Sequence, residues 1–168
     1  SAKSAEAFIA KMKCSDCMLD RDWAITPMTS SRKCQLIHTV TTNRGEPLLA
    51  LADVHPNAHI TAVGADSPGK QELGLDLIDS AALCLTDSLA QTVERGEYQH
   101  YIRANGLDVA GIRAKFQEIG AYSSSHRARP AEGITIFDTS GVAVQDVAIA
   151  TLAVQMLGQG TTFPGSRL

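Results

Sequence analysis

The sequence lacks the features that define several large classes of protein. Its 168 residues contain no apolar run of the roughly 18–20 residues needed to cross a bilayer. Four cysteines are too few for a disulfide scaffold at this length. The sequence has 15 basic and 18 acidic residues and thus a net charge of −3, so we expect no basic face that would bind nucleic acid. We therefore expect one domain over residues 1–168, cytoplasmic with reduced thiols, that binds neither nucleic acid nor membrane.

The spacing of cysteine and histidine does not favour a metal site. Cys14 and Cys17 form a C-x-x-C pair but lack the second ligand pair that zinc needs. His55 and His59 are four residues apart, and Pro56 between them opposes a shared helix face. We therefore expect no bound metal.

Hydrophobic periodicity predicts helices and strands that alternate along the chain. The expected strands cover residues 23–26, 34–41, 58–64, 83–87 and 134–138. The expected helices cover residues 4–12, 73–81, 89–103, 108–120 and 142–157. Alternation of this kind predicts an α/β fold, in which a mostly parallel sheet carries helices on its faces.

Three of these helices have a predicted environment. The helix over 89–103 carries Glu94, Glu97 and His100, which we expect on an exposed polar face. The helix over 142–157 is largely apolar, so we expect it to be buried on most sides. The helix over 108–120, capped by Asp108, is expected to bury Val109, Ile112, Phe116 and Ile119.

Functional residues of a parallel sheet lie in loops after the carboxyl ends of the strands. The predicted loops of this kind cover residues 41–45, 64–70, 87–90 and 138–141. The loop Gly64–Lys70 contains one carboxylate, one hydroxyl and one ammonium. Asp66 could exchange protons with a substrate amine or an attacking water, and Lys70 could hold a carboxylate or phosphate. The alternative is an ordinary turn, because these residue types are common in turns.

Hydroxyl groups occur in two more of these loops. Thr139, Ser140 and Gly141 follow a predicted strand and open a predicted helix, where free N–H groups suit an amide, phosphate or carboxylate. A simple helix cap is the alternative. Thr41 and Thr42 end another predicted strand and could line the same crevice.

Two longer motifs resemble one known family. ITAVGADSPGKQEL at 60–73 and IFDTSGVAVQD at 136–146 resemble the ornithine cyclodeaminase/μ-crystallin family. TVTTNRGEPLL at 39–49, DSLAQTVERGEYQHYI at 87–102 and EIG at 118–120 support the resemblance. These pieces follow the family's order and approximate spacing, so the resemblance covers nearly the whole chain.

The resemblance implies a Rossmann-like domain that binds NAD or NADP. Ornithine cyclodeaminases oxidise the substrate amine with NAD⁺, release ammonia, close the ring and reduce the resulting imine to proline. Relatives reduce cyclic ketimines or other imines, or interconvert alanine and pyruvate. A third possibility is a truncated, non-catalytic μ-crystallin-like protein that binds a small ligand or dimerises.

The resemblance also implies roles for individual residues. Asp66 would be the catalytic, proton-handling carboxylate, and Thr139 would lie near the nicotinamide carboxamide. Thr41 and Thr42 match positions beside the cofactor ribose. The residues expected to bind the cofactor are Thr41, Thr42, Lys70, Thr139, Ser140 and Gly141.

The chain departs from the family in what it lacks. It has no G-x-G-x-x-G turn, whose backbone N–H groups approach a pyrophosphate, and no counterpart of the family's N-terminal substrate-binding portion. The resemblance then predicts that the strand over 34–41 becomes an open edge. That edge is expected to meet a missing N-terminal portion, a second copy in a homodimer, or the strand over 23–26 in a rearranged sheet.

Overall fold

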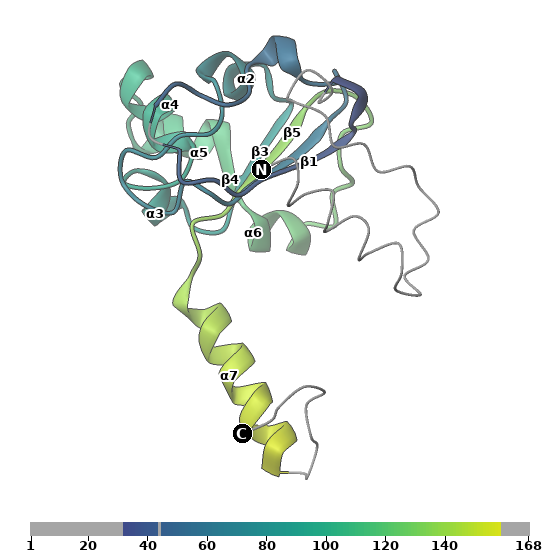
Figure 1. Cartoon of the computed structure of the whole chain (residues 1–168), viewed down its shortest axis with the longest axis vertical. Coiled ribbons are helices and arrows are strands. Elements are labelled where there is room, and N and C mark those ends of the chain that lie inside the picture. The colour runs from purple at the N-terminus through teal and green to yellow at the C-terminus, as the bar shows by residue number, and fades with distance from the viewer. Residues whose placement is uncertain (1–31, 44, 159–168) are drawn as a thin grey trace, which may run out of the picture.

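The computed structural model describes residues 32–43 and 45–158, which form a parallel α/β fold (Figure 1). The predicted helix over 4–12, the predicted strand over 23–26 and the Cys14–Cys17 pair lie outside the described residues. In chain order the elements are β1 (Leu36–Thr39), η2 (Leu51–Asp53), β2 (His59–Ala62), α2 (Leu75–Ser80), β3 (Leu83–Thr86), α3 (Leu89–Thr92), α4 (Tyr98–Asn105), α5 (Val109–Lys115), β4 (Phe116–Glu118), α6 (Ile119–Ser124), β5 (Thr135–Asp138) and α7 (Ala143–Gly158).

The five strands of the described residues are parallel and lie in the order β1-β2-β5-β3-β4. The register places one apolar row across the sheet, formed by Ile37, Ile60, Ile136, Cys84 and Phe116. Because side chains alternate between the faces of a strand, this row lies on a single face. Helices α2, α4 and α5 supply the other half of the core above it.

The connections explain why helices lie on both faces. The chain moves from β2 to β3 and on to β4 in one direction across the sheet, then returns from β4 to β5 through α6. Right-handed crossovers in opposite directions place their helices on opposite faces. Accordingly, α6 lies on the other side of the sheet from α2 (Figure 1). The predicted α/β fold is confirmed.

Strand β1 is an edge of the described sheet. It pairs with β2 on one side. Leu36 within it and Val40 just after it are 59% and 69% exposed. The open edge predicted for this segment is therefore present in the described part of the chain.

Two predicted helices are broken in the structure. The expected helix over 89–103 is divided into α3 and α4, because Gly96 adopts a left-handed φ of 84°. The expected helix over 108–120 ends at Lys115, and Phe116 begins strand β4. The predicted cap at Asp108 is confirmed, since its side chain accepts a hydrogen bond from the Gly111 N–H. Ile112 and Phe116 are buried as predicted, whereas Val109 and Ile119 are exposed.

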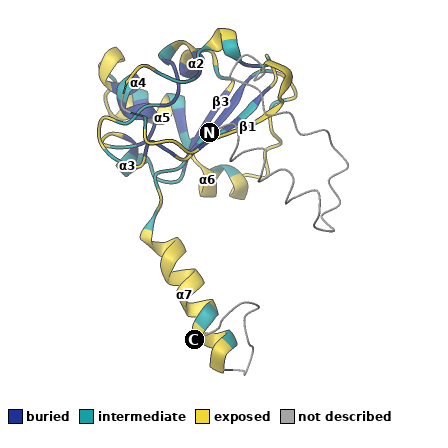
Figure 2. Ribbon diagram, in the orientation of Figure 1, coloured by how far each residue is buried: buried dark blue, intermediate teal, exposed yellow. Residues whose placement is uncertain are grey.

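Helix α7 is exposed, so the prediction that it is buried on most sides was wrong. It extends away from the sheet, and none of its residues is buried (Figures 1 and 2). Its exposed large apolar side chains are Val144, Val147, Ile149, Leu152, Val154 and Leu157. The segment is a helix rich in apolar side chains, as the sequence indicates. The described residues, however, provide no surface against which this helix is buried. Within the described ranges, no helix is long and apolar enough to span a membrane.

Candidate functional site

The predicted functional loops lie at one edge of the sheet. The register aligns Thr39, Ala62, Asp138 and Thr86 at the carboxyl ends of β1, β2, β5 and β3. The loops that follow these strands therefore begin as neighbours. This is the edge at which parallel α/β sheets bind ligands.

Asp66 lies on the exposed loop after β2 and pairs with Lys70. The Lys70 Nζ atom is 2.6 Å from Asp66 Oδ1, and the two side chains are 13% and 58% exposed, respectively. The hydrogen bond from Lys70 holds the pKa of Asp66 below its ordinary value. Asp66 is therefore a carboxylate at neutral pH, able to accept a proton and open to solvent.

A buried carboxylate joins the ends of β1 and β2. Glu72 is fully buried and accepts hydrogen bonds from the Thr41 N–H at 2.6 Å and the Gly64 N–H at 3.0 Å. A Cβ atom on Gly64 would lie 2.2 Å from the Thr41 oxygen and 2.5 Å from the Glu72 carboxyl group. Glycine is required here because the backbone and Glu72 approach so closely. Thr41 and Thr42 themselves are exposed beyond the end of β1.

Two further buried carboxylates continue this network. Glu97 accepts hydrogen bonds from the N–H groups of Glu72 and Leu73 at 2.9–3.0 Å. Asp138, at the end of β5, accepts one from the Glu97 N–H at 2.9 Å. Burial raises the pKa of Glu97 to about 8 and that of Asp138 to about 7. The placement of Glu97 on an exposed polar face was wrong, and His100 is half-buried.

The loop after β5 is held by Asp87, which follows β3. Asp87 Oδ2 accepts hydrogen bonds from the Thr139 hydroxyl at 2.8 Å and from the Gly141 N–H at 2.7 Å. The Ser140 hydroxyl donates to Gln91 Oε1 at 2.9 Å. The Gly141 N–H is therefore not free. The Asp87 carboxylate repels a phosphate or a second carboxylate at this position. The hydroxyl oxygens of Thr139 and Ser140 still have lone pairs that can accept hydrogen bonds from an amide.

Sequence reasoning found the exposed residues of this edge and missed the buried ones. Asp66 and the two hydroxyl-bearing loops were identified because they follow predicted strands. Glu72, Asp138 and Gln99 were missed because nothing local distinguishes a buried polar residue from a solvated one. The only local pattern near Glu97 is the preceding glycine, Gly96, which marks a close approach of the backbone to Asp138.

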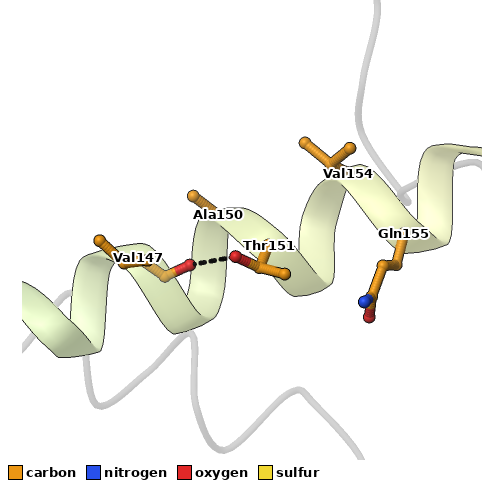
Figure 3. Close-up of a pocket in the computed structure, with 5 residues that line it drawn as sticks. All are labelled: Val147, Ala150, Thr151, Val154 and Gln155. Atoms are coloured by element: carbon orange, nitrogen blue, oxygen red, sulfur yellow. Dashed lines mark hydrogen bonds between the residues drawn. The ribbon is translucent and has the colours of Figure 1, made fainter.

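A separate hollow of about 390 Å³ lies along α7 (Figure 3). It is lined by Val147, Ala150, Thr151, Val154 and Gln155, and the Thr151 hydroxyl donates to the Val147 carbonyl at 2.7 Å. Because these lining residues carry no titratable group, the hollow is suited to packing.

The fold and the polar carboxyl edge define a Rossmann-like α/β protein. The model of the ornithine cyclodeaminase/mu-crystallin family matches residues 3–159, and the chain belongs to that family. The resemblance seen in the sequence is thereby confirmed.

Known relatives include enzymes that are much longer than this chain. It is 33% identical over 132 residues to the alanine dehydrogenase of Archaeoglobus fulgidus, covering 79% of this chain and 40% of the relative. It is 38% identical over 118 residues to the iminosuccinate reductase of Paracoccus denitrificans, covering 68% and 35%. The structure of an archaeal alanine dehydrogenase dimer with bound NAD superimposes with a TM-score of 0.78 at 28% identity, covering 99% of this chain and 50% of that one. The chain therefore spans half or less of the length of these relatives.

Proposed function

We propose that this chain belongs to an NAD- or NADP-dependent enzyme that oxidises the amine of a small amino acid or reduces the corresponding imine. The observation that carries the proposal is Asp66, a solvent-open carboxylate beside the Lys70 ammonium at the carboxyl edge of a parallel sheet. Membership of a family with dehydrogenase and reductase members supports it.

The residues of this edge fit part of a nicotinamide dinucleotide. Thr139 and Ser140 give their hydroxyl protons to Asp87 and Gln91, so their oxygens can accept hydrogen bonds from a carboxamide. The exposed hydroxyls of Thr41 and Thr42 could contact a ribose. The sequence contains no Gly-rich turn for the pyrophosphate, so that contact would come from outside this chain.

The proposed mechanism assigns proton handling to Asp66. When bound, NAD(P) supplies hydride exchange at the substrate carbon. In the oxidative direction, Asp66 accepts a proton from the substrate amine or from the water that adds to the imine. In the reductive direction, the protonated Asp66 returns that proton to nitrogen. The Lys70 ammonium stabilises the carboxylate form and could orient a substrate carboxylate.

Two overall reactions fit these steps. In the first, an amino acid such as ornithine is oxidised and loses ammonia as it closes to a cyclic imine, and the hydride removed in the oxidation then returns to the imine to give a cyclic imino acid such as proline. In the second, a ketimine or other imine is reduced, or alanine is oxidised to pyruvate. The names of the relatives, alanine dehydrogenase and iminosuccinate reductase, favour the second.

We further propose that α7 and the β1 edge are covered by protein outside the described residues. A largely apolar, exposed helix and a strand edge left unpaired in the described sheet both favour association. The candidates are an N-terminal portion like the half of the relatives that this chain does not span, or a second copy in a homodimer. A non-catalytic member that only binds a ligand or dimerises is the alternative to an enzyme.

The experiment is a substrate screen with the protein that contains this chain. Ornithine, alanine and cyclic imines are tested with NAD(H) and NADP(H), in the native sequence and in Asp66→Asn. Loss of the proton-handling group should lower kcat by ~10²-fold or more, while the dissociation constant for cofactor changes little. Asp146→Asn, which removes an exposed carboxylate on α7, is the matched control. Unchanged turnover in Asp66→Asn would remove Asp66 from the mechanism.

A further inference from the structure

The segment Gly96–His100 contacts the Asp66 loop along its length. The Gly96 N–H donates to the Ala65 carbonyl at 2.6 Å, at the start of the loop. The His100 Nε2 atom lies 3.1 Å from the Lys70 carbonyl oxygen, at the other end. The loop that carries Asp66 is therefore held by the start of α4.

Gln99 makes the central contacts between this segment and the loop. Its side chain is fully buried. Its Oε1 atom accepts a hydrogen bond from the Gly69 N–H at 3.0 Å. Its Nε2 atom donates to the carbonyls of Lys70 and Ser67 at 3.3 and 3.5 Å, and to the Gly96 carbonyl of its own segment at 2.9 Å. One amide thus contacts both sides of the turn.

This turn determines where the Lys70 side chain begins. The Lys70 N–H donates to the Ser67 carbonyl at 3.3 Å, and Gly69 adopts a left-handed φ of 79°. The ion pair between Lys70 and Asp66, which directly precedes the turn, spans this turn. A change in the turn moves the Lys70 ammonium relative to the Asp66 carboxylate.

We propose that Gln99 is a positioning residue for Asp66. It holds the Ser67–Lys70 turn in the geometry that brings the Lys70 ammonium against the Asp66 carboxylate. An amide suits this place because the turn presents an N–H donor and carbonyl acceptors at once, and an uncharged amide carries an acceptor oxygen and a donor NH₂ group side by side. The proposal rests on the catalytic role proposed for Asp66, although its first test does not.

The test measures the Asp66 pKa and the exchange of the Gly69 amide hydrogen by NMR in the full chain. The variant Gln99→Met preserves side-chain length but removes the donor and acceptor. We expect the Asp66 pKa to rise toward the value measured in Lys70→Met, and Gly69 exchange to accelerate about tenfold or more. Gln117→Met, which makes the same change on β4, should alter neither measurement. Gln99→Asn, whose amide is one methylene too short to reach both sides of the turn, repeats the test if Gln99→Met does not fold.

The outcomes separate this inference from the proposed function. A folded Gln99 variant in which the Asp66 pKa is unchanged overturns the positioning role. A raised Asp66 pKa with a lowered kcat and little change in KM, measured in the protein that contains this chain, supports both proposals. A raised Asp66 pKa with unchanged kcat supports the positioning role and rejects Asp66 as the proton-handling group.

Discussion

At the scale of single residues, three buried carboxylates organise the carboxyl edge of the sheet. Glu72, Glu97 and Asp138 each accept hydrogen bonds from backbone N–H groups of another segment. Backbone N–H groups favour the ionised carboxylate, whereas burial disfavours it. For Glu97 and Asp138 burial is the larger effect, since both pKa values are raised. Protonation in this network is therefore coupled to the stability of the fold.

Stability should fall as pH rises through the neutral range. A carboxyl group whose pKa is raised on folding, such as Glu97 from 4.5 to about 8, binds its proton more tightly in the folded state. The contribution of protonated Glu97 to the free energy of unfolding is complete below about pH 4.5, and it is lost progressively as the pH rises to about 8. Each unit of pKa shift corresponds to about 1.4 kcal/mol. Urea unfolding between pH 5 and 8 should show a smaller fall in Glu97→Gln than in the native sequence.

The control for this experiment is Glu132→Gln, which changes an exposed carboxyl group. Its unfolding free energy should follow the native curve across the same pH range. Asp138, whose pKa is raised from 3.8 to about 7, continues to titrate in Glu97→Gln, so a residual fall is expected between pH 5 and about pH 7. Parallel curves for the native sequence and Glu97→Gln would contradict the raised pKa of Glu97.

Gly96 should not tolerate a side chain. It adopts a φ of 84°, and a Cβ atom would lie 2.3 Å from Asp138 Oδ2. Left-handed strain and displacement of the Asp138 carboxylate together should lower the unfolding free energy of Gly96→Ala by about 2–4 kcal/mol. Gly120→Ala is the matched control, because nothing lies within 4 Å of its Cβ position in α6. Equal stability of the two variants in urea unfolding would show that the close approach is absent.

At the scale of elements, α7 is a helix whose sequence and surroundings disagree. Its apolar residues predict burial, but all of its large apolar side chains are exposed or half-buried (Figure 2). Val147, Ala150 and Val154 form one apolar stripe beside the hollow (Figure 3). A contiguous exposed apolar stripe of this kind is typical of a surface that associates with another protein.

We expect the purified chain to self-associate through α7. The double variant Val147→Glu/Val154→Glu should lower the sedimentation-average mass at high protein concentration. Because these side chains are exposed, the unfolding free energy should change by less than about 0.5 kcal/mol. Gln145→Glu adds one charge at another position of α7 and serves as the control. Identical masses for the double variant and the native chain would exclude association through this stripe.

At the scale of the whole molecule, the chain resembles one part of a longer enzyme. It covers 50% or less of the relatives and lacks a Gly-rich turn. It retains the carboxyl edge with Asp66, while strand β1 is unpaired on one side in the described sheet. The features proposed for proton handling are thus present without those that would hold the cofactor pyrophosphate.

We expect the 168-residue chain alone to bind NADH and NADPH weakly. Each hydrogen bond to a charged group contributes about 1.5–3 kcal/mol. The loss of two pyrophosphate contacts would therefore raise a dissociation constant of about 1 μM to above about 0.1 mM. Nicotinamide fluorescence in a titration of the chain measures this directly. Saturable binding in the micromolar range would instead mean that the carboxyl edge holds the cofactor without the Gly-rich turn.

Much of the fold could be predicted because its determinants are local. The segments around β1, β2, β3 and β5 were identified from β-rich runs bounded by turn residues, and Asp108 was identified as a helix cap. The errors occurred where a tertiary contact overrides the local pattern. Phe116 pairs with Cys84 in the sheet, so the helix before it ends early. Glu97 turns inward because Gly96 redirects the chain beside Asp138.

The sequence by itself determined the alternation of strands and helices and the positions of Asp66 and Lys70 in a strand-end loop. Both follow from periodicity and turn residues within a few positions of one another. Only the tertiary structure decided that Glu72 would bond to Thr41, 31 residues away, and that Glu97 would bond to Asp138, 41 residues away. Whether a polar side chain is solvated or buried depends on which segments pack over it. Residues distant in the chain supply those segments, so a local sequence pattern cannot predict whether such a side chain is buried.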